Sequence, residues 1–117
     1  MAIPPSIEIP RWYLVVLNSL YEIECKLKVH GDLGHAKRNI DRIKEEFEQQ
    51  SLIIEDPMGQ PFKETRTDLE ATIVGSDTEN LVVTEVIKPV IRRVNGPISR
   101  VVQKGIVVVQ AKEEAQP

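Results

Sequence analysis

The chain has 117 residues, of which 41% are hydrophobic and 28% charged, with a formal net charge of -3. These values are typical of a water-soluble protein with room for one modest domain, or a small domain plus a helical accessory. The negative charge argues against a nucleic-acid surface, which carries a basic patch, and a single cysteine excludes an internal disulfide.

The first ten residues contain Pro4, Pro5 and Pro10 but no basic or long apolar run, so no secretory signal is visible. No apolar run approaches the roughly 20 residues that cross a bilayer. We therefore expect a cytoplasmic protein without a membrane partner. Residues 1–10 are expected to be an extended lead-in.

A first helix is predicted from Arg11 to about Val29, because apolar residues recur there at helical spacing. The recurring positions are Tyr13, Val16, Leu17, Leu20, Ile23 and Leu27. Further apolar residues widen this surface, so the helix needs more than one neighbour to cover it. Gly31 is suited to end the helix and Asp32 to cap the next one.

A second helix is predicted from about Leu33 to Gln50, with apolar residues three and four positions apart. Its apolar seam is Leu33, Ala36, Ile40, Ile43 and Phe47. The other faces are charged and are expected to be solvated. The short connection implies an antiparallel helical hairpin over residues 11–50.

A hairpin with this much apolar surface is poorly covered in a monomer. Pairing two hairpins across a two-fold axis into a four-helix bundle would bury the excess. We therefore predict a homodimer. The residues assigned to the dimer contact are Leu17, Leu20, Leu27, Leu33, Ile40, Ile43 and Phe47.

After Gln50 the hydrophobic period changes, which predicts a small β-domain over residues 51–110 and a polar tail over 111–117. Strands are expected at 52–55, 69–74 and 81–94, with Pro89 marking an edge, bulge or corner in the third. Asn95-Gly96 predicts a hairpin. The last apolar run, Arg100 to Val109, is one strand or two joined at Gly105. The predicted fold class is α+β.

Between the first two strands, Asp56-Pro57-Met58-Gly59-Gln60-Pro61 predicts a compact turn. Phe62 is the only aromatic residue of this half and is expected to anchor its core. Lys63 to Asp68 is expected to be a charged loop.

Residue types that carry chemistry form no recognisable site. The glycines lie in no phosphate-binding pattern. Cys25, His30 and His35 are spaced by five, which places them off one helical face, and a zinc site needs more ligands. We predict no metal and no cofactor.

Glu70 and Glu85 both lie on predicted strands and could be imagined as an acid–base pair. Strand carboxylates more often face solvent or pair with a nearby arginine, here Arg92, Arg93 or Arg100. Nothing else supplies a nucleophile or an oxyanion donor. We therefore predict no catalytic residues and no enzyme.

The order of these elements resembles the GrpE family, the nucleotide exchange factors of Hsp70 (DnaK-type) chaperones. Phe62 followed by Glu70-Ala71 resembles the family's Phe-Asp-Pro…His-Glu-Ala element. The segment from Val83 to Lys88 is similar to its Val-x-Glu-Val-x-x-Lys strand. The run from Arg100 to Val109 resembles its closing Arg-Val-Leu-Arg-Pro-Ala-x-Val-x-Val. The match extends from about Arg11 to Val109.

The resemblance implies a co-chaperone that acts by binding its partner and not by catalysing a reaction. In the family, a small β-domain docks on the Hsp70 ATPase domain and favours an open nucleotide cleft, so ADP leaves faster. By position, Ile87, Arg100 and Val109 match residues that meet this domain in relatives. Arg100 is the main candidate, because its planar fork can hold an acidic or carbonyl-rich surface. The alternative for Arg100 is an internal pair with Glu70 or Glu85.

The chain also departs from the family pattern. Leu69 replaces a histidine, Lys88-Pro89-Val90 replaces Lys-Gly-Tyr, and more residues lie between Lys88 and Arg100. The ten residues before Arg11 leave no room for the family's long paired helices, so the resemblance is to a short or divergent member. Two alternatives remain: an adaptor for an Hsp70-like or other partner without exchange activity, and a small β-barrel that binds a ligand.

Overall fold

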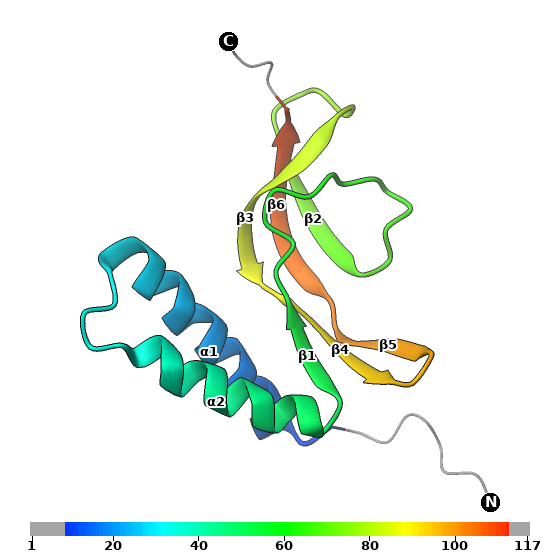
Figure 1. Cartoon of the computed structure of the whole chain (residues 1–117). Helices are drawn as coiled ribbons and strands as arrows, with labels where there is room; N and C mark the ends of the chain where they lie inside the picture. The colour runs from blue at the N-terminus through cyan, green and yellow to red at the C-terminus, as the bar shows by residue number, and fades with distance from the viewer. Residues whose placement is uncertain (1–8, 113–117) are drawn as a thin grey trace, which may run out of the picture. The chain divides into compact units, whose positions relative to one another are not determined.

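The structure, a computed structural model, describes residues 9–112 and contains two helices and six strands in that range. The chain divides into two compact units, Met1–Glu46 and Phe47–Pro117. The first is helical and the second contains two three-stranded sheets, which confirms the predicted α+β class (Figure 1). The predicted lead-in and tail lie largely outside the described residues. No helix in residues 9–112 is long and apolar enough to cross a membrane.

Helix α1 spans Arg11–His30, in agreement with the helical spacing of its apolar residues. Pro10 precedes it, and the Pro10 carbonyl accepts a hydrogen bond from the Tyr13 N–H at 2.9 Å. Gly31 ends it at φ 90, with its N–H donating to the Leu27 carbonyl at 2.7 Å. This backbone conformation is easily reached only by glycine, which explains why the helix ends there.

Helix α2 spans Ala36–Gln49 and begins three residues after the predicted start at Leu33. Leu33 lies in the connection between the helices and is 98% exposed. The Asp32 carboxylate still caps α2: it accepts hydrogen bonds from the Ala36 N–H at 2.6 Å and the Lys37 N–H at 2.9 Å. The hydrogen bond from Lys37 is the main reason that the pKa of Asp32 is lowered.

The two helices form the predicted antiparallel hairpin (Figure 1). Glu24 of α1 joins them, with one carboxylate oxygen 3.1 Å from Lys44 Nζ and the other 3.7 Å from Lys37 Nζ. Lys37 also pairs with Asp41 at 3.0 Å, and this hydrogen bond is the largest cause of the raised pKa of Lys37.

The second unit contains all six strands. They are β1 (Leu52–Glu55), β2 (Leu69–Val74), β3 (Leu81–Lys88), β4 (Val90–Asn95), β5 (Ile98–Gln103) and β6 (Gly105–Ala111). The strand orders are β1-β4-β5 and β2-β6-β3. Strands β2 and β6 are parallel, and the other pairs are antiparallel.

The chain changes sheet three times: once through the loop between β1 and β2, and twice at single residues. Pro89 separates β3 from β4, so the break predicted at this proline is confirmed. Lys104 separates β5 from β6, so the last apolar run is two strands. Gln103 Nε2 donates to the Pro89 carbonyl at 2.9 Å, which ties the two crossing points together.

The sheet β2-β6-β3 carries an aliphatic core. Its buried residues are Leu69, Leu81, Val83, Val90, Val107 and Val109. Phe62 packs against this cluster, as predicted, from the turn that follows β1. The turn also lines the outer edge of β3, where the Phe62 N–H donates to the Leu81 carbonyl at 2.8 Å.

Gly105, the first residue of β6, lies where the core is most crowded. A Cβ at this position would lie 2.8 Å from Leu69 Cδ2 and 3.0 Å from Val90 Cγ2. Its N–H also donates to the Asp68 carbonyl at 2.9 Å. A larger residue here would therefore have to displace the side chains of Leu69 and Val90, which the apolar pattern of the run did not indicate.

Candidate partner-docking surface

The three predicted contact residues lie on three different strands of the β unit: Ile87 on β3, Arg100 on β5 and Val109 on β6. Ile87 is 53% exposed, and Arg100 is also exposed. The two belong to different sheets. Arg93, the partner of Arg100 across β4, lies six residues beyond Ile87. At the usual rise per strand residue this is at most about 20 Å, and Pro89 breaks the strand between them, so Ile87 and Arg100 do not share one strand face.

Val109 requires a correction. Its side chain is 0% exposed and belongs to the aliphatic core of the β2-β6-β3 sheet. A side chain without accessible surface cannot touch a docked partner. Val109 therefore supports the β unit by packing and is not a contact residue of this structure.

Several residues assigned to the dimer contact also require correction. Four are already buried in a single chain: Leu17, Leu20, Ile40 and Phe47. Leu27 is half-buried, whereas Leu33 and Ile43 are exposed. The helical periodicity identified the apolar side of each helix correctly, but it could not tell the residues that a single chain covers from those left open.

The β4–β5 hairpin holds the exposed Arg100. Asn95 and Ile98 form the closing pair around Gly96 and Pro97. Gly96 has φ 63 at the first central position, where a type II′ turn requires glycine. The hairpin predicted at Asn95-Gly96 is therefore confirmed.

Arg93 lies directly opposite Arg100 across this hairpin. Opposite residues share one face, with Cβ atoms about 4.5–5.5 Å apart, and like charges in this arrangement destabilise the sheet. Ile98 is two residues before Arg100, on the same face, and is 63% exposed. We call Arg93, Ile98 and Arg100 the hairpin face.

Within the described part of the chain, the positive charge of Arg93 has no acidic partner. In residues 9–112 no carboxylate pairs with its guanidinium. The residue is only half-exposed, so its guanidinium is partly shielded from water. The sequence offered a signal for this pair, since residues equidistant from a two-residue hairpin turn become partners.

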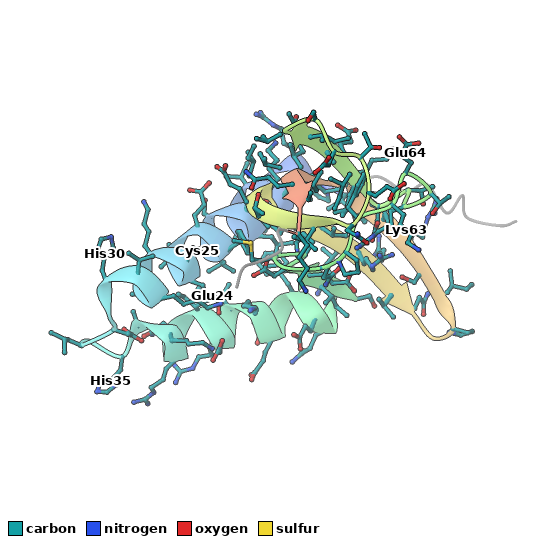
Figure 2. The ribbon with its side chains drawn as sticks, turned by 90° about the horizontal axis from the view of Figure 1, so that it is seen from above. Glu24, Cys25, His30, His35, Lys63 and Glu64 are labelled. Atoms are coloured by element: carbon teal, nitrogen blue, oxygen red, sulfur yellow. The ribbon has the colours of Figure 1, made fainter. Side chains whose placement is uncertain are left out.

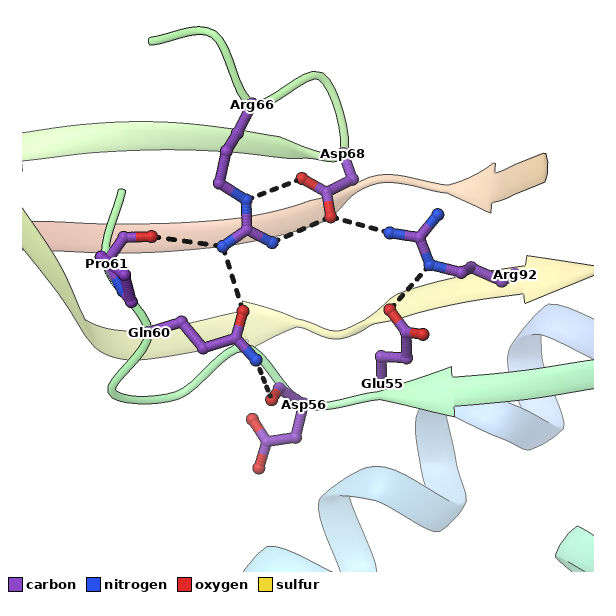
Figure 3. A network of polar contacts seen from close by, with 7 residues as sticks. All are labelled: Glu55, Asp56, Gln60, Pro61, Arg66, Asp68 and Arg92. Carbon is purple, nitrogen blue, oxygen red and sulfur yellow. Dashed lines mark hydrogen bonds and ion pairs between the residues drawn. The ribbon is translucent and has the colours of Figure 1, made fainter. Parts of the chain in front are cut away.

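A second polar cluster joins the two sheets of the β unit (Figure 3). Arg66 donates a hydrogen bond to each carboxylate oxygen of Asp68, with N···O distances of 3.0 and 2.9 Å. Arg92 on β4 donates to the same Asp68 at 2.9 Å and to Glu55 at 2.7 Å. The hydrogen bonds from Arg66 are the main reason that the pKa of Asp68 is lowered, and the charge of Arg92 acts in the same direction.

This cluster has a structural role. Asp68 comes just before β2, and Glu55 is the last residue of β1. Because Arg92 pairs with both, these ion pairs hold the start of β2 close to the end of β1. The sequence predicted a charged loop from Lys63 to Asp68 but did not indicate its partner. Arg92 pairs with these residues, and Glu70 and Glu85 are exposed without an ion pair in the described part of the chain.

The residues considered for metal or nucleophilic chemistry are not brought together. Figure 2 shows His30 and His35 at the helix connection, with Cys25 farther along α1. Cys25 is a half-buried free thiol. Between residues 9 and 112, no three or more His, Cys, Asp and Glu side chains are placed to hold a metal ion.

Two open grooves flank the end of the β2-β6-β3 sheet. One, of about 440 Å³, is lined by residues 76–80, 111 and 112. The other, of about 610 Å³, lies between residues 61–64 and residues 73 and 78–81. Neither collects titratable groups around an enclosed cavity, and the described strands form two open sheets rather than a closed barrel. The β-barrel alternative is therefore not supported.

Comparison of the chain with protein-family models, with curated proteins and with solved structures found no match. The sequence motifs and the geometry of the hairpin face are the features of this chain that bear on its function.

Proposed function

We propose that this protein is a co-chaperone of the GrpE type, a nucleotide exchange factor that docks on an Hsp70 ATPase domain through its β unit. The motif resemblance supports this proposal. So does the order of elements, in which a helical hairpin precedes a β unit of two small sheets. The observation that supports docking through the β unit is the hairpin face, where Arg100 is exposed beside a second arginine.

Such a protein acts by linkage. A partner that binds the open form of a nucleotide cleft more tightly than the closed form must weaken nucleotide binding by the same factor. No residue of this chain needs to touch the nucleotide. The requirement is a rigid surface with the right charge, and a two-residue hairpin anchored in a packed β unit provides one.

The decisive experiment is stopped-flow release of labelled ADP from each Hsp70 of the host, with and without this protein. We expect release to accelerate with protein concentration and then to saturate. The exchange-factor proposal is refuted if no Hsp70 responds at saturating protein.

At the residue level, Arg100→Ala should raise the protein concentration needed for half-maximal acceleration about tenfold, because an arginine in a docking surface is commonly a dominant contact. The measurement is the same titration, with Arg38→Ala as a control in the exposed part of α2. Loss of folding or of the oligomer in Arg100→Ala would instead assign the residue a structural role.

The homodimer also belongs to this proposal, with a revised contact. Ile23 of α1 and Ile43 of α2 are 42% and 41% exposed. They directly precede Glu24 and Lys44, which form the ion pair between the helices. In antiparallel helices this equal offset turns both isoleucines to the same side of the hairpin. That side is the open apolar surface on which a second hairpin would pack.

We therefore expect the combined change Ile23→Glu and Ile43→Glu to convert a dimer into a folded monomer. Sedimentation velocity at micromolar concentration measures this, with Arg38→Glu as a charge control. A wild-type chain that is already monomeric would overturn the dimer.

An adaptor without exchange activity is the second candidate. The β4–β5 hairpin favours it, since it occupies the part of the chain that is longer than the family pattern. A protein that binds an Hsp70 ATPase domain without changing ADP release would establish this candidate.

A further inference from the structure

The β4–β5 hairpin carries two features that the motif resemblance does not account for. Arg93 and Ile98 belong to the segment between Lys88 and Arg100, where the chain departs from the family pattern. Both side chains lie on the face of the hairpin that also carries Arg100. Each is unfavourable for an isolated protein, although for a different reason.

Arg93 is unfavourable because of electrostatics. It lies opposite Arg100 in the strand register, so a residue of like charge shares its face, and no carboxylate in residues 9–112 pairs with it. The neighbouring Arg92 shows that the chain can neutralise an arginine, since it pairs with both Glu55 and Asp68. Arg93 and Arg92 are adjacent in sequence but point to opposite faces of β4, and only the face of Arg92 meets acidic residues.

Ile98 is unfavourable because of hydration. It is a large apolar side chain at the hairpin turn, and 63% of its surface is exposed. Two guanidiniums alone would suit a free anion such as phosphate, but an exposed isoleucine beside them would gain nothing from it. A protein surface can cover the isoleucine and pair with Arg93 at the same time, which favours a protein as the occupant.

We infer that the hairpin face is the specificity-determining part of the docking surface and that it fits an acidic protein surface with an apolar recess between its carboxylates. This inference rests on the proposed function, since it places that acidic surface on the Hsp70 ATPase domain. Arg93 and Arg100 supply paired charge, which steers association and fixes orientation, and Ile98 fills the recess.

The test compares the affinity of variants for the ATPase domain of the responding Hsp70, measured by calorimetry at about 50 and 300 mM salt. Arg93→Ala and Ile98→Ser should each weaken binding about five- to tenfold. Arg93→Ala should also reduce the salt dependence of the affinity, whereas Ile98→Ser should leave it unchanged. Arg93→Lys should fall between wild type and alanine, because lysine keeps the charge but loses the planar fork.

Lys63→Ala is the matched control. Lys63 is an exposed cation of the same unit, in the loop before β2 (Figure 2), and it has no ion pair in the described residues. Its removal should leave the affinity unchanged. Thermal unfolding separates binding from folding: Arg93→Ala removes a like-charge contact, so its melting temperature should equal or slightly exceed that of wild type.

The outcomes are distinguishable. If wild type accelerates ADP release but Arg93→Ala and Ile98→Ser bind as it does, the inference is overturned and the proposed function stands. If wild type neither binds nor accelerates any Hsp70, the proposed function is overturned and the inference with it. If inorganic phosphate binds the isolated protein in a manner that requires Arg93, the face is an anion site and the inference is again overturned.

Discussion

The two sheets of the β unit have the same number of strands but bury different amounts of apolar surface. The β2-β6-β3 sheet contributes five of the six residues in the buried aliphatic cluster, and only Val90 comes from the other sheet. The β1-β4-β5 sheet instead carries three arginines and an exposed hairpin. Apolar burial is the main favourable term in folding, so the first sheet contributes more of the unit's stability. The second sheet buries Leu52, Val90 and Ile91 but leaves its hairpin end exposed.

The largest effect expected from this division is at Val109. Val109→Ala should lower the free energy of unfolding by about 2–3 kcal/mol, because it leaves a cavity in the core of the stabilising sheet. Urea unfolding measures it. Val108→Ala on the other face of β6 is the control and should cost less, since Val108 is only half-buried. Equal costs at the two positions would contradict the division.

A smaller effect is expected at Gly105. Gly105→Ala should destabilise by about 1–3 kcal/mol, because the added methyl meets Leu69 and Val90 and the core must shift to admit it. The comparison is Gly34→Ala, in the helix connection, where an added Cβ meets nothing within 4 Å. If Gly105→Ala left stability unchanged, the close packing of β6 against Leu69 and Val90 would be contradicted.

The ion pairs of Asp68, which link the two sheets, should contribute still less to the free energy of unfolding. Asp68→Asn should cost about 1–2 kcal/mol at neutral pH, because Arg66 and Arg92 lose a charged partner. Asp77→Asn, in the exposed turn after β2, is the control and should be neutral.

This contribution should also depend on pH. The pKa of Asp68 is lowered from its ordinary value of 3.8, so the stability it supplies is complete above that pH. It is lost as the pH falls through 3.8 toward the lower pKa of the folded state. The cost of Asp68→Asn, measured by urea unfolding, should therefore shrink on acidification from neutral pH. A cost that stayed constant down to pH 2 would exclude the ion pair as its source.

The local elements were largely predictable from the sequence, whereas their partners were not. Strands 52–55 and 69–74 agree with the structure, because a short apolar run in the first and alternation in the second are properties of the segment itself. The start of α2 was misplaced because His35 adopts φ 59, a backbone state that no periodicity reveals. The position of Val109 inside the core depends on which face of β6 is covered, and a motif match carries no information on that.

The pairing of residues in the hairpin face could have been predicted from the sequence. Once Gly96-Pro97 is accepted as a two-residue turn, counting outward pairs residue 95 with 98 and residue 93 with 100. The ion pair between Arg92 and Asp68 could not have been predicted in this way, because it depends on how the two sheets pack. Local turn chemistry thus predicts contacts within a hairpin, and only the folded chain determines contacts between sheets.

The place of β6 at the centre of its sheet has a consequence for how the protein folds. β2 and β3 are neighbours in sequence but do not pair with each other. Both pair with β6, which comes last in the chain. Leu69 meets Gly105, its partner 36 residues later, so the sheet closes only after a long loop has been ordered. The β4–β5 hairpin, by contrast, needs only its own turn. We expect the β4–β5 hairpin to form within microseconds and the β2-β6-β3 sheet to set the slower overall rate of folding.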